Sequence, residues 1–539
     1  MGKNKNIPLS RRTKKRRIAD QISIMTRSLQ ANHPIISSTS HESPELIHHS
    51  SDISENEFIQ CNELPNILPV DLISDNQRPA LSSEDELVKT SNSLEQFIEN
   101  VRIWASNFKI SNNSLDALLI ILKEHKCFQQ LPRTARTVMQ TKSIDINNMH
   151  IVEPGHYYHV GIKKGIKRYL PNEFEGFDIK IVIGVDGLPI SKSNSNQFWP
   201  ILAYIRPSSA VFPIGIYFGK LKPKDSNQFL DEMCKEASEL ITNGLEINNI
   251  VFNFSIDALC CDAPAKSFLL KTKGHSGFYS CTRCQIEGEY LQNRMCFPYE
   301  SLSNASPKRT HNDYIEKNKE EFHISNDVSI IASLPGINVV TSFSLDYMHL
   351  ICLGVVRKLI MMWIKGPVSV RYPSWKIKEV SSAMEKLKAQ IPCEFARKPR
   401  SFDEISRWKA TEYRTFLLYT GPIVMKSILK KDHWKHFLAL SISMTILLSP
   451  DHSKFLFIAR NLLDYFLKRY EQIYGSYLMS HNFHGLNHIS DDYDMYGPLD
   501  NVSAFPFENY MGQLKKMLRK PHKPLEQIVK RYRWRSAQV

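Results

Sequence analysis

Five predicted secondary-structure elements between residues 177 and 256 constrain the fold of this chain more than any other feature. Three β-rich runs come first, and then an amphipathic helix with apolar residues at helical spacing leads to a fourth β-rich run. In chain order these elements are 177–185, 198–205, 210–218, 225–245 and 250–256. The turn pair Asp186-Gly187 closes the first run. The predicted order is therefore β-β-β-α-β.

This order predicts a ribonuclease-H-like mixed sheet, an α/β fold in which the fourth strand lies parallel beside the first. Adjacent parallel strands end at the same edge of a sheet, so Asp186 would lie near an acid that comes just after the fourth strand. Asp262 and Asp257 are both candidates for that acid. A lone acid after a strand is usually a turn or helix cap, so the strand order is what favours a shared site.

The composition changes several times along the 539 residues. Residues 1–30 hold nine Lys/Arg and one acid, whereas 31–100 hold thirteen acids and two basic residues in a Ser-rich context. Such segments are typical of disordered chains, because they bury too little apolar area to offset ordering. The sequence predicts five parts: a disordered basic then acidic tail (1–92), a small helical region (93–145), and the first part of the core (146–270). A largely helical insertion with a zinc knuckle (271–490) and a core return with a basic C-terminal helix (491–539) follow.

The net charge of +14 favours a polyanionic partner such as DNA, because Lys/Arg that neutralise phosphates drive nucleic-acid binding. A solvated basic surface is the alternative. Basic clusters at 11–12 and 14–17 predict a nuclear-localisation signal or a nucleic-acid arm. No secretory signal pattern follows Met1, and the longest apolar stretch, 437–449, is shorter than the roughly twenty residues that span a bilayer. We expect a buried helix there and no membrane partner.

Cys281 and Cys284 have the Cys-x-x-Cys spacing of one half of a zinc site. The sequence has no second Cys-x-x-Cys to complete it. His349 is the predicted third ligand, and His275 and Cys296 are weaker candidates. A redox pair or two packed thiols are the alternatives, although no catalytic base or redox context accompanies the cysteines.

Two further polar segments lie toward the C-terminus. His481, His484 and His488 recur just before three aspartates, and they would approach a metal or DNA, or belong to an ordinary surface loop. Residues 515–535 hold nine Lys/Arg and one acid, interleaved with aromatic and apolar residues, after a predicted helix that carries Glu508. This tract is typical of a track for a phosphate backbone, and a solvated helix face is the alternative.

Four ordered motifs of this chain resemble the DDE transposases of CACTA-type (EnSpm) DNA transposons, in the form found in animal genomes. The similarity covers about residues 95–530. The motifs are VDGLPISKSNSNQFWPI, DALCCDAPAKSFLLKTKGHSGFYSCTRC, LDYMHLICLGV and GPLDNVSAFPFENYMGQLKKMLRKPHKPLEQI. Four motifs in this order are far more specific than any one of them.

The resemblance implies three catalytic acids that bind Mg²⁺ or Mn²⁺. They are Asp186 in the Asp-Gly pair, Asp262 in the Asp-Ala-Pro-Ala motif, and Glu508 in the Phe-Glu-x-Tyr-Met motif. Carboxylate oxygens suit these hard cations, and a pair of them about 4 Å apart activates the attacking oxygen and stabilises the leaving one in phosphoryl transfer.

The resemblance also implies a structural Zn²⁺ on Cys281, Cys284 and His349, and it assigns no fourth ligand. The implied function is DNA strand cleavage and transfer in the nucleus, with transposon terminal repeats and target DNA as partners and a homo-oligomer as the assembly. Water would attack a phosphodiester at the element end, and the freed 3′-hydroxyl would attack target DNA. The alternative function is that of a domesticated or decayed transposase, a non-catalytic nuclear DNA-binding protein.

Overall fold

The computed structural model describes residues 94–536, apart from 106–107, 109, 140–147, 172, 192–194 and 302–303. The predicted tail at 1–92, with its basic clusters, lies outside the described residues. The predicted small helical region contains a helix at 94–105 and three short helices, α3 (Asn112–Lys123), η1 (Lys126–Phe128) and α4 (Ala135–Val138). Asp116 Oδ1 accepts a hydrogen bond from the Ala135 backbone N–H at 2.6 Å, which joins α3 to the start of α4.

The protein is a mixed α/β protein built on a mixed sheet. The sheet runs in the order β1-β2-β6-β5-β3-β8-β11, with β4 paired to β5 and β7 to β8. The pairs β3–β8 and β8–β11 are parallel, and the other pairs described are antiparallel. The strands are β1 (Met149–Val152), β2 (Gly155–His159), β3 (Asp178–Val185), β4 (Leu188–Pro189), β5 (Gln197–Ile205), β6 (Phe212–Gly219), β7 (Leu245–Ile247), β8 (Ile250–Cys261) and β11 (Phe343–Leu345); β9 (Glu289–Leu291) and β10 (Arg294–Cys296) form a separate hairpin.

The four predicted strands and the helix among them are confirmed as β3, β5, β6, β8 and α6 (Ser226–Asn243). The predicted parallel contact of the fourth strand with the first is also present, because β8 pairs with β3 from Asp178 to Gly184. Strand β8 is longer than predicted and runs to Cys261 instead of ending near 256. Its extra residues pair with β11, a strand that the sequence patterns did not indicate and that lies within the predicted insertion at 271–490.

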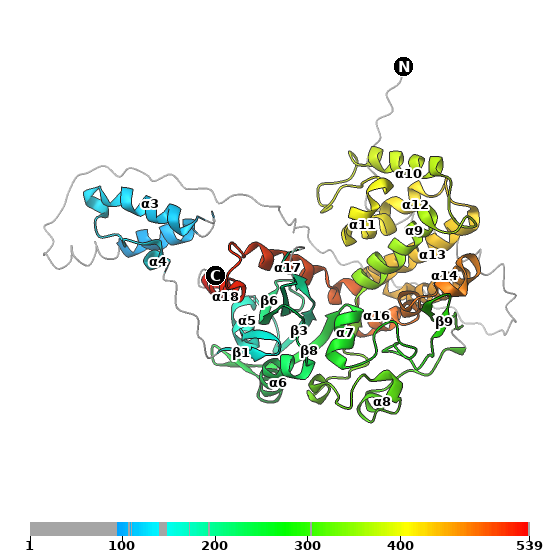
Figure 1. The fold of residues 1–539 in the computed structure, drawn as a ribbon, viewed down its shortest axis with the longest axis horizontal. Helices are drawn as coiled ribbons and strands as arrows, with labels where there is room; N and C mark the ends of the chain where they lie inside the picture. Colours follow the sequence, from blue (N-terminus) through cyan, green and yellow to red (C-terminus); the bar gives the residue numbers. More distant parts are fainter. Residues whose placement is uncertain are drawn as a thin grey trace, which may run out of the picture. The chain divides into compact units, whose positions relative to one another are not determined.

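Helices cover both faces of the sheet (Figure 1). Isoleucines of β3 such as Ile181 and Ile183 point to one face, where they join a cluster with α6 and α7 (Ala263–Leu270). The opposite face, including Val182, packs against α17 (Phe505–Lys516) and α18 (Pro524–Ser536). Successive strand residues face opposite sides, so this alternation buries the strand on both faces.

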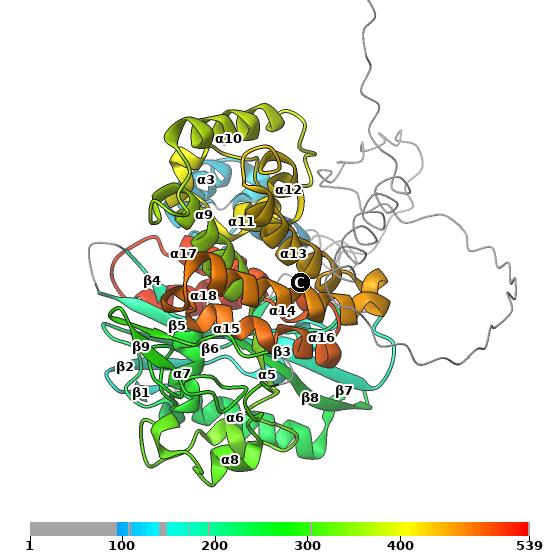
Figure 2. The same ribbon diagram turned by 90° about the vertical axis from the view of Figure 1, so that its right-hand side faces the viewer.

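A largely helical region connects β11 to α17. Helices α13 and α14 lie side by side within it (Figure 2), and the ring of His436 stacks on Phe466 with centroids 4.2 Å apart. Most residues of α13 are buried, which confirms the predicted buried helix. The remaining helices are α5 (Ile162–Tyr169), α8 (His311–Ile315), η4 (Glu320–Phe322), η5 (Ile330–Ser333), η6 (Met348–Val356), α9 (Arg357–Lys365), α10 (Ser374–Leu387), η7 (Phe402–Arg407), α11 (Ala410–Thr415), η8 (Phe416–Thr420), α12 (Gly421–Val424), α13 (Lys431–Leu447), η9 (Pro450–Phe455), α14 (Leu456–Tyr474), η10 (Ser476–Leu478), α15 (His481–His484), η11 (Gly485–Asn487), α16 (Ile489–Tyr496) and η12 (Leu499–Val502).

Candidate metal centres

Two of the predicted acids lie at one edge of the sheet. Asp186 directly follows β3, and Asp262 directly follows β8. Asp262 is also the N-cap of α7, where its Oδ1 accepts a hydrogen bond from the Ala265 backbone N–H at 2.7 Å. Both carboxylates line the same small cavity, as expected for residues that follow two adjacent parallel strands.

The third predicted acid reaches the same cavity from the C-terminal part of the chain. Glu508 lies in the first turn of α17, and His349 comes from η6, shortly after β11. Ligand atoms of Asp186, His349 and Glu508 all lie within 4.8 Å of one another. Asp262 is not in this closest set, but it lines the cavity beside them. We refer to these four residues as the acid site.

A close backbone approach allows α17 to bring Glu508 to the sheet. The ring of Phe507 lies directly over Gly184, where an added Cβ would be 2.3 Å from its Cδ2 atom. The same ring contacts Tyr204 of β5, with centroids 5.2 Å apart. Asp346 holds the start of α17, because its Oδ1 accepts a hydrogen bond from the Ala504 backbone N–H at 2.8 Å. The start of α17 is therefore held at two points just before Glu508, by Phe507 against the sheet and by Ala504 to Asp346.

The acid site concentrates negative charge in a partly buried place. Burial and the nearby carboxylates of Asp262 and Glu508 together raise the pKa of Asp186 to about 7, against the opposing effects of His349 and of a hydrogen bond from the Gly187 backbone N–H. Burial lowers the pKa of His349, but a 2.6 Å hydrogen bond from its Nδ1 to Asp346 outweighs this effect and raises that pKa to about 9. Three clustered carboxylates with one imidazole nearby are a suitable environment for a cation.

The structure separates Asp262 from the other candidate, Asp257. Asp257 lies within β8, and its carboxylate forms an ion pair with the guanidinium of Arg206. Arg206 also donates to the backbone oxygen of Tyr496 at 3.0 Å, so Asp257 belongs to a structural contact away from the acid-site cavity. Asp262 is the one that lines the cavity with Asp186.

A second group, which we call the Cys/His group, consists of Cys281, Cys284, His484 and His488. All four are buried, and their ligand atoms lie within 4.8 Å of one another. Cys284 Sγ is 3.6 Å from Cys281 Sγ and 3.2 Å from His484 Nε2, which in turn is 3.3 Å from His488 Nε2. Two sulfurs and two imidazole nitrogens are a complete donor set for a tetrahedral structural zinc, so this group could bind a metal such as zinc.

The thiol of Cys281 is also electrostatically suited to a metal. Burial opposes ionisation of Cys281, but a hydrogen bond with Cys284 and the two imidazoles outweigh it and hold the pKa of Cys281 well below its usual range. A thiolate is the form that binds zinc. The four residues present therefore fit the ion that the Cys-x-x-Cys spacing indicated.

The prediction of His349 as the third ligand beside the cysteines is wrong. His349 lies with Asp186 and Glu508 instead, and the Cys/His group contains His484 and His488. Neither weaker candidate joins the group: Cys296 Sγ donates to the Tyr477 backbone oxygen at 3.1 Å, and His275 is exposed. The four-residue spacing of His484 and His488 was the signal that could have identified the pair.

Basic side chains continue from the acid site along α17. Lys515 and Lys516 are exposed in its last turn, and Lys515 Nζ donates to the Pro189 backbone oxygen at 2.9 Å, close in sequence to Asp186. Lys520 and Lys523 are exposed in the connection to α18. The predicted basic tract therefore begins on the helix that carries Glu508.

Comparisons with known proteins add no family to these observations. No protein-family model matches the chain, and no curated protein matches it. Among the described residues, no helix has both the length and the apolar character needed to cross a membrane.

Proposed function

We propose that this chain is a metal-dependent DNA strand-cleavage and strand-transfer enzyme of the DDE transposase kind, with Asp186, Asp262 and Glu508 as its catalytic acids. One observation carries the proposal. Ligand atoms of Asp186, His349 and Glu508 lie within 4.8 Å of one another although they come from three distant segments, and Asp262 lines the same cavity. A chance surface cluster would not need β3, η6 and α17 to converge.

The arrangement of strands supports a ribonuclease-H-like core. In that fold the fourth strand lies parallel beside the first, and β8 has this relation to β3. The strands β3, β5 and β6 form the antiparallel run that opens it, and α6 connects β6 to the β7–β8 pair. Asp186 and Asp262 then occupy the two strand ends at which such a fold would hold its first two acids.

The acid site suits Mg²⁺ or Mn²⁺, which prefer carboxylate oxygens. The pKa of Asp186, raised to about 7 by burial and by its acidic neighbours, reflects repulsion that a bound cation would offset. Such ions supply Lewis-acid activation of the attacking oxygen and stabilisation of the leaving one. The protein orients the ligands: Asp346 accepts hydrogen bonds from His349 Nδ1 and from the Ala504 N–H at the start of α17.

The basic tract supports DNA as the substrate. Lys515 and Lys516 extend from the helix of Glu508, so a phosphate backbone that contacts them would lead toward the acids. Exposed Glu508 leaves this side of the cavity open to a large substrate. Transposon terminal repeats and target DNA as partners, a homo-oligomer and a nuclear location belong to the same proposal, and they rest on the sequence resemblance and on basic clusters outside the described residues.

The Cys/His group is proposed to hold a structural Zn²⁺. Its ligands come from two segments far apart in the chain, so an ion bound to all four would fix these segments together in the way of structural zinc sites.

A strand-cleavage assay tests the proposal. The full chain is incubated with supercoiled plasmid and with end-labelled duplex DNA, with Mg²⁺, with Mn²⁺ and without either. We expect nicked or joined products only with the ion, and loss of product in Asp186→Asn, Asp262→Asn and Glu508→Gln. Asp257→Asn is the matched control, because it removes a neighbouring carboxylate that pairs with Arg206.

Two outcomes would contradict the catalytic proposal. Cleavage that survives in all three acid variants would show that another site is responsible. Salt-sensitive DNA binding with no metal-dependent product would instead support the alternative, a non-catalytic DNA-binding protein.

A further inference from the structure

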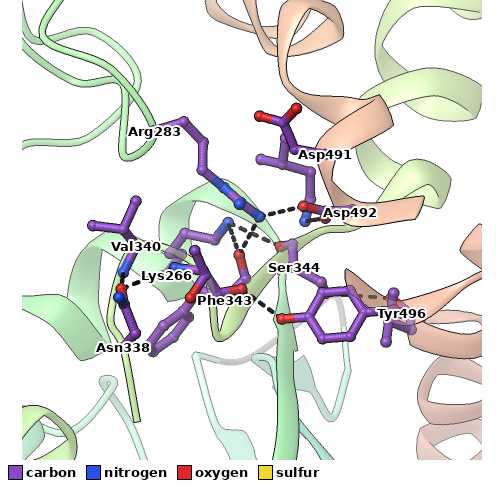
Figure 3. Close-up of polar contacts among 12 residues, drawn as sticks. Lys266, Arg283, Asn338, Val340, Phe343, Ser344, Asp491, Asp492 and Tyr496 are labelled. Atoms are coloured by element: carbon purple, nitrogen blue, oxygen red, sulfur yellow. Dashed lines mark hydrogen bonds and ion pairs between the residues drawn. The ribbon is translucent and has the colours of Figure 1, made fainter. Parts of the chain in front are cut away.

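The two segments that form the Cys/His group also form a buried ion pair beside this group. Arg283 lies between the two cysteines, and Asp492 lies in the first turn of α16, which begins just after His488. Arg283 Nη2 donates to Asp492 Oδ1 at 2.5 Å (Figure 3), and the two side chains are 5% and 0% exposed. Each half of the metal group thus contributes one partner of this ion pair.

The ion pair is attached to β11, the three-residue strand at the end of the sheet. Arg283 Nη2 also donates to the Phe343 backbone oxygen at 3.0 Å, and the Leu345 N–H donates to Asp492 Oδ2 at 2.5 Å. The middle residue, Ser344, accepts from Lys266 Nζ of α7 at 2.9 Å. A buried charged side chain therefore bonds the backbone of every residue in β11, and Figure 3 shows these contacts at Phe343 and Ser344.

Strand β11 leads directly into the acid site. The next residue, Asp346, accepts from His349 Nδ1 at 2.6 Å and from the Ala504 N–H at 2.8 Å, at the start of the helix that carries Glu508. The third attachment, Lys266, comes from α7, whose N-cap is Asp262. A displacement of β11 would therefore reach three members of the acid site.

From this chain of contacts we propose that Arg283 and Asp492 are positioning residues that couple the Cys/His group to the acid site. The two halves of the group, held together, keep the ion pair closed and β11 in place. If the segment of Cys281 and Cys284 separated from the segment of His484 and His488, the buried guanidinium and carboxylate would each lose their partner. Breaking a buried ion pair is costly, so β11 would have to rearrange together with these two segments. This inference rests on the proposed function for the meaning of the acid site, but the coupling itself is a physical property that is measured separately.

The test uses Arg283→Gln in the full chain, because Asp492 keeps its bond to Leu345 in this variant. Zinc content, Mn²⁺ affinity, DNA cleavage and hydrogen exchange of the amides at 345–350 and 504–510 are measured. We expect retained zinc, faster exchange in both segments, and a loss of Mn²⁺ affinity and of cleavage rate of about tenfold or more, as for other residues that support metal ligands. If Arg283→Gln does not fold, Arg283→Lys, which keeps the charge but loses the forked geometry, is measured by the same criteria.

The control is Arg460→Gln, which removes the ion pair of Arg460 with Asp494 on the same helix, α16. Within the described residues this pair forms no hydrogen bond or ion pair with β11, so exchange at 345–350 should stay at the wild-type rate. Zinc-loaded Arg283→Gln with wild-type exchange and wild-type Mn²⁺ affinity would overturn the proposal. Loss of zinc in that variant would also overturn it, since Arg283 would then support the Cys/His group itself.

The readouts separate this inference from the proposed function. If the wild-type chain neither binds Mn²⁺ nor cleaves DNA, the proposed function fails. Hydrogen exchange in Arg283→Gln would still decide whether Arg283 holds the segment after β11, because it needs neither DNA nor a cation at the acid site.

Discussion

Gly184→Ala should displace the helix that carries Glu508. Gly184 is the next-to-last residue of β3, and the added methyl group would lie 2.3 Å from Cδ2 and 2.5 Å from Cγ of Phe507. The ring cannot turn away easily, because it is 4% exposed and also contacts Tyr204. Phe507 precedes Glu508 in the first turn of α17, so the two residues would have to move together.

The structure gives the size of the expected effects on unfolding free energy and on cleavage rate. Ordinary van der Waals contact begins near 3.4 Å, so the ring and the strand must separate by about 1 Å. Overpacking of this kind costs about 1–3 kcal/mol of unfolding free energy. A displacement of about 1 Å at a reacting group can lower the rate about 100-fold, so cleavage should fall far more than stability alone would explain.

Urea unfolding and the plasmid-cleavage assay measure these two effects on the same protein. Gly512→Ala is the matched control, since it lies on the same helix with no atom within 4 Å of the added Cβ, and alanine should stabilise that helix by up to about 1 kcal/mol. The double variant Gly184→Ala/Phe507→Leu should recover part of the lost activity, because the smaller side chain makes room. Unchanged stability and cleavage in Gly184→Ala would refute the close approach of α17 to the sheet.

Three further predictions concern the metal groups and the basic tract. Cys284→Ser and His488→Ala should each lose the one bound zinc ion and unfold at a lower temperature, as measured by metal analysis and calorimetry; full zinc content in both would contradict the assignment. Burial and the neighbouring acids raise the pKa of Asp186 from 3.8 to about 7, so its contribution to stability is present below about pH 4 and is lost as the pH rises through 7. Asp186→Asn should therefore gain stability relative to wild type between about pH 5 and pH 8 in buffer without Mg²⁺ or Mn²⁺, and urea unfolding showing no such gain would argue against the carboxylate cluster. Lys516→Ala should reduce the slope of log affinity for DNA against log salt by about 1, whereas Lys235→Ala, whose ammonium pairs with Asp231 on α6, should not change it.

The sequence predicted those parts of the fold that depend on neighbouring residues. The alternation of strand residues and the helical spacing of α6 were sufficient to find β3, β5, β6 and β8 and to place Asp186 at a strand end. The predicted strand stopped too early because Asp257 interrupts the apolar pattern of β8. The ion pair of Asp257 with Arg206 allows the strand to continue to Cys261. The choice between Asp257 and Asp262 therefore depended on a contact across the sheet that no local pattern contains.

Ligands that come from distant segments were harder to assign. Cys281 and Cys284 carry a local signal. Their partners do not, because His484 ends the four-residue helix α15 and His488 lies between η11 and α16, with no continuous helical pattern. His349 was assigned to the wrong group because a sequence cannot show which way a side chain faces. Here His349 Nδ1 donates a hydrogen bond to Asp346 Oδ2, which fixes the ring and leaves Nε2 to face the acid site.

The long helical region between β11 and α17 does not disturb the acid site, because its two ends are bonded to each other. Asp346 accepts from the Ala504 N–H, and the neighbouring Tyr347 donates to Asp500 Oδ1 at 2.6 Å. Arg414 of α11 donates to the other oxygen of Asp500 at 2.6 Å, so a helix of the region itself contacts this closure. The entropic free-energy cost of closing a loop rises by only about 0.6 kcal/mol for each doubling of loop length, so a few such bonds can hold a very long connection. Glu508 can therefore come from beyond this region and still have its position set by the sheet.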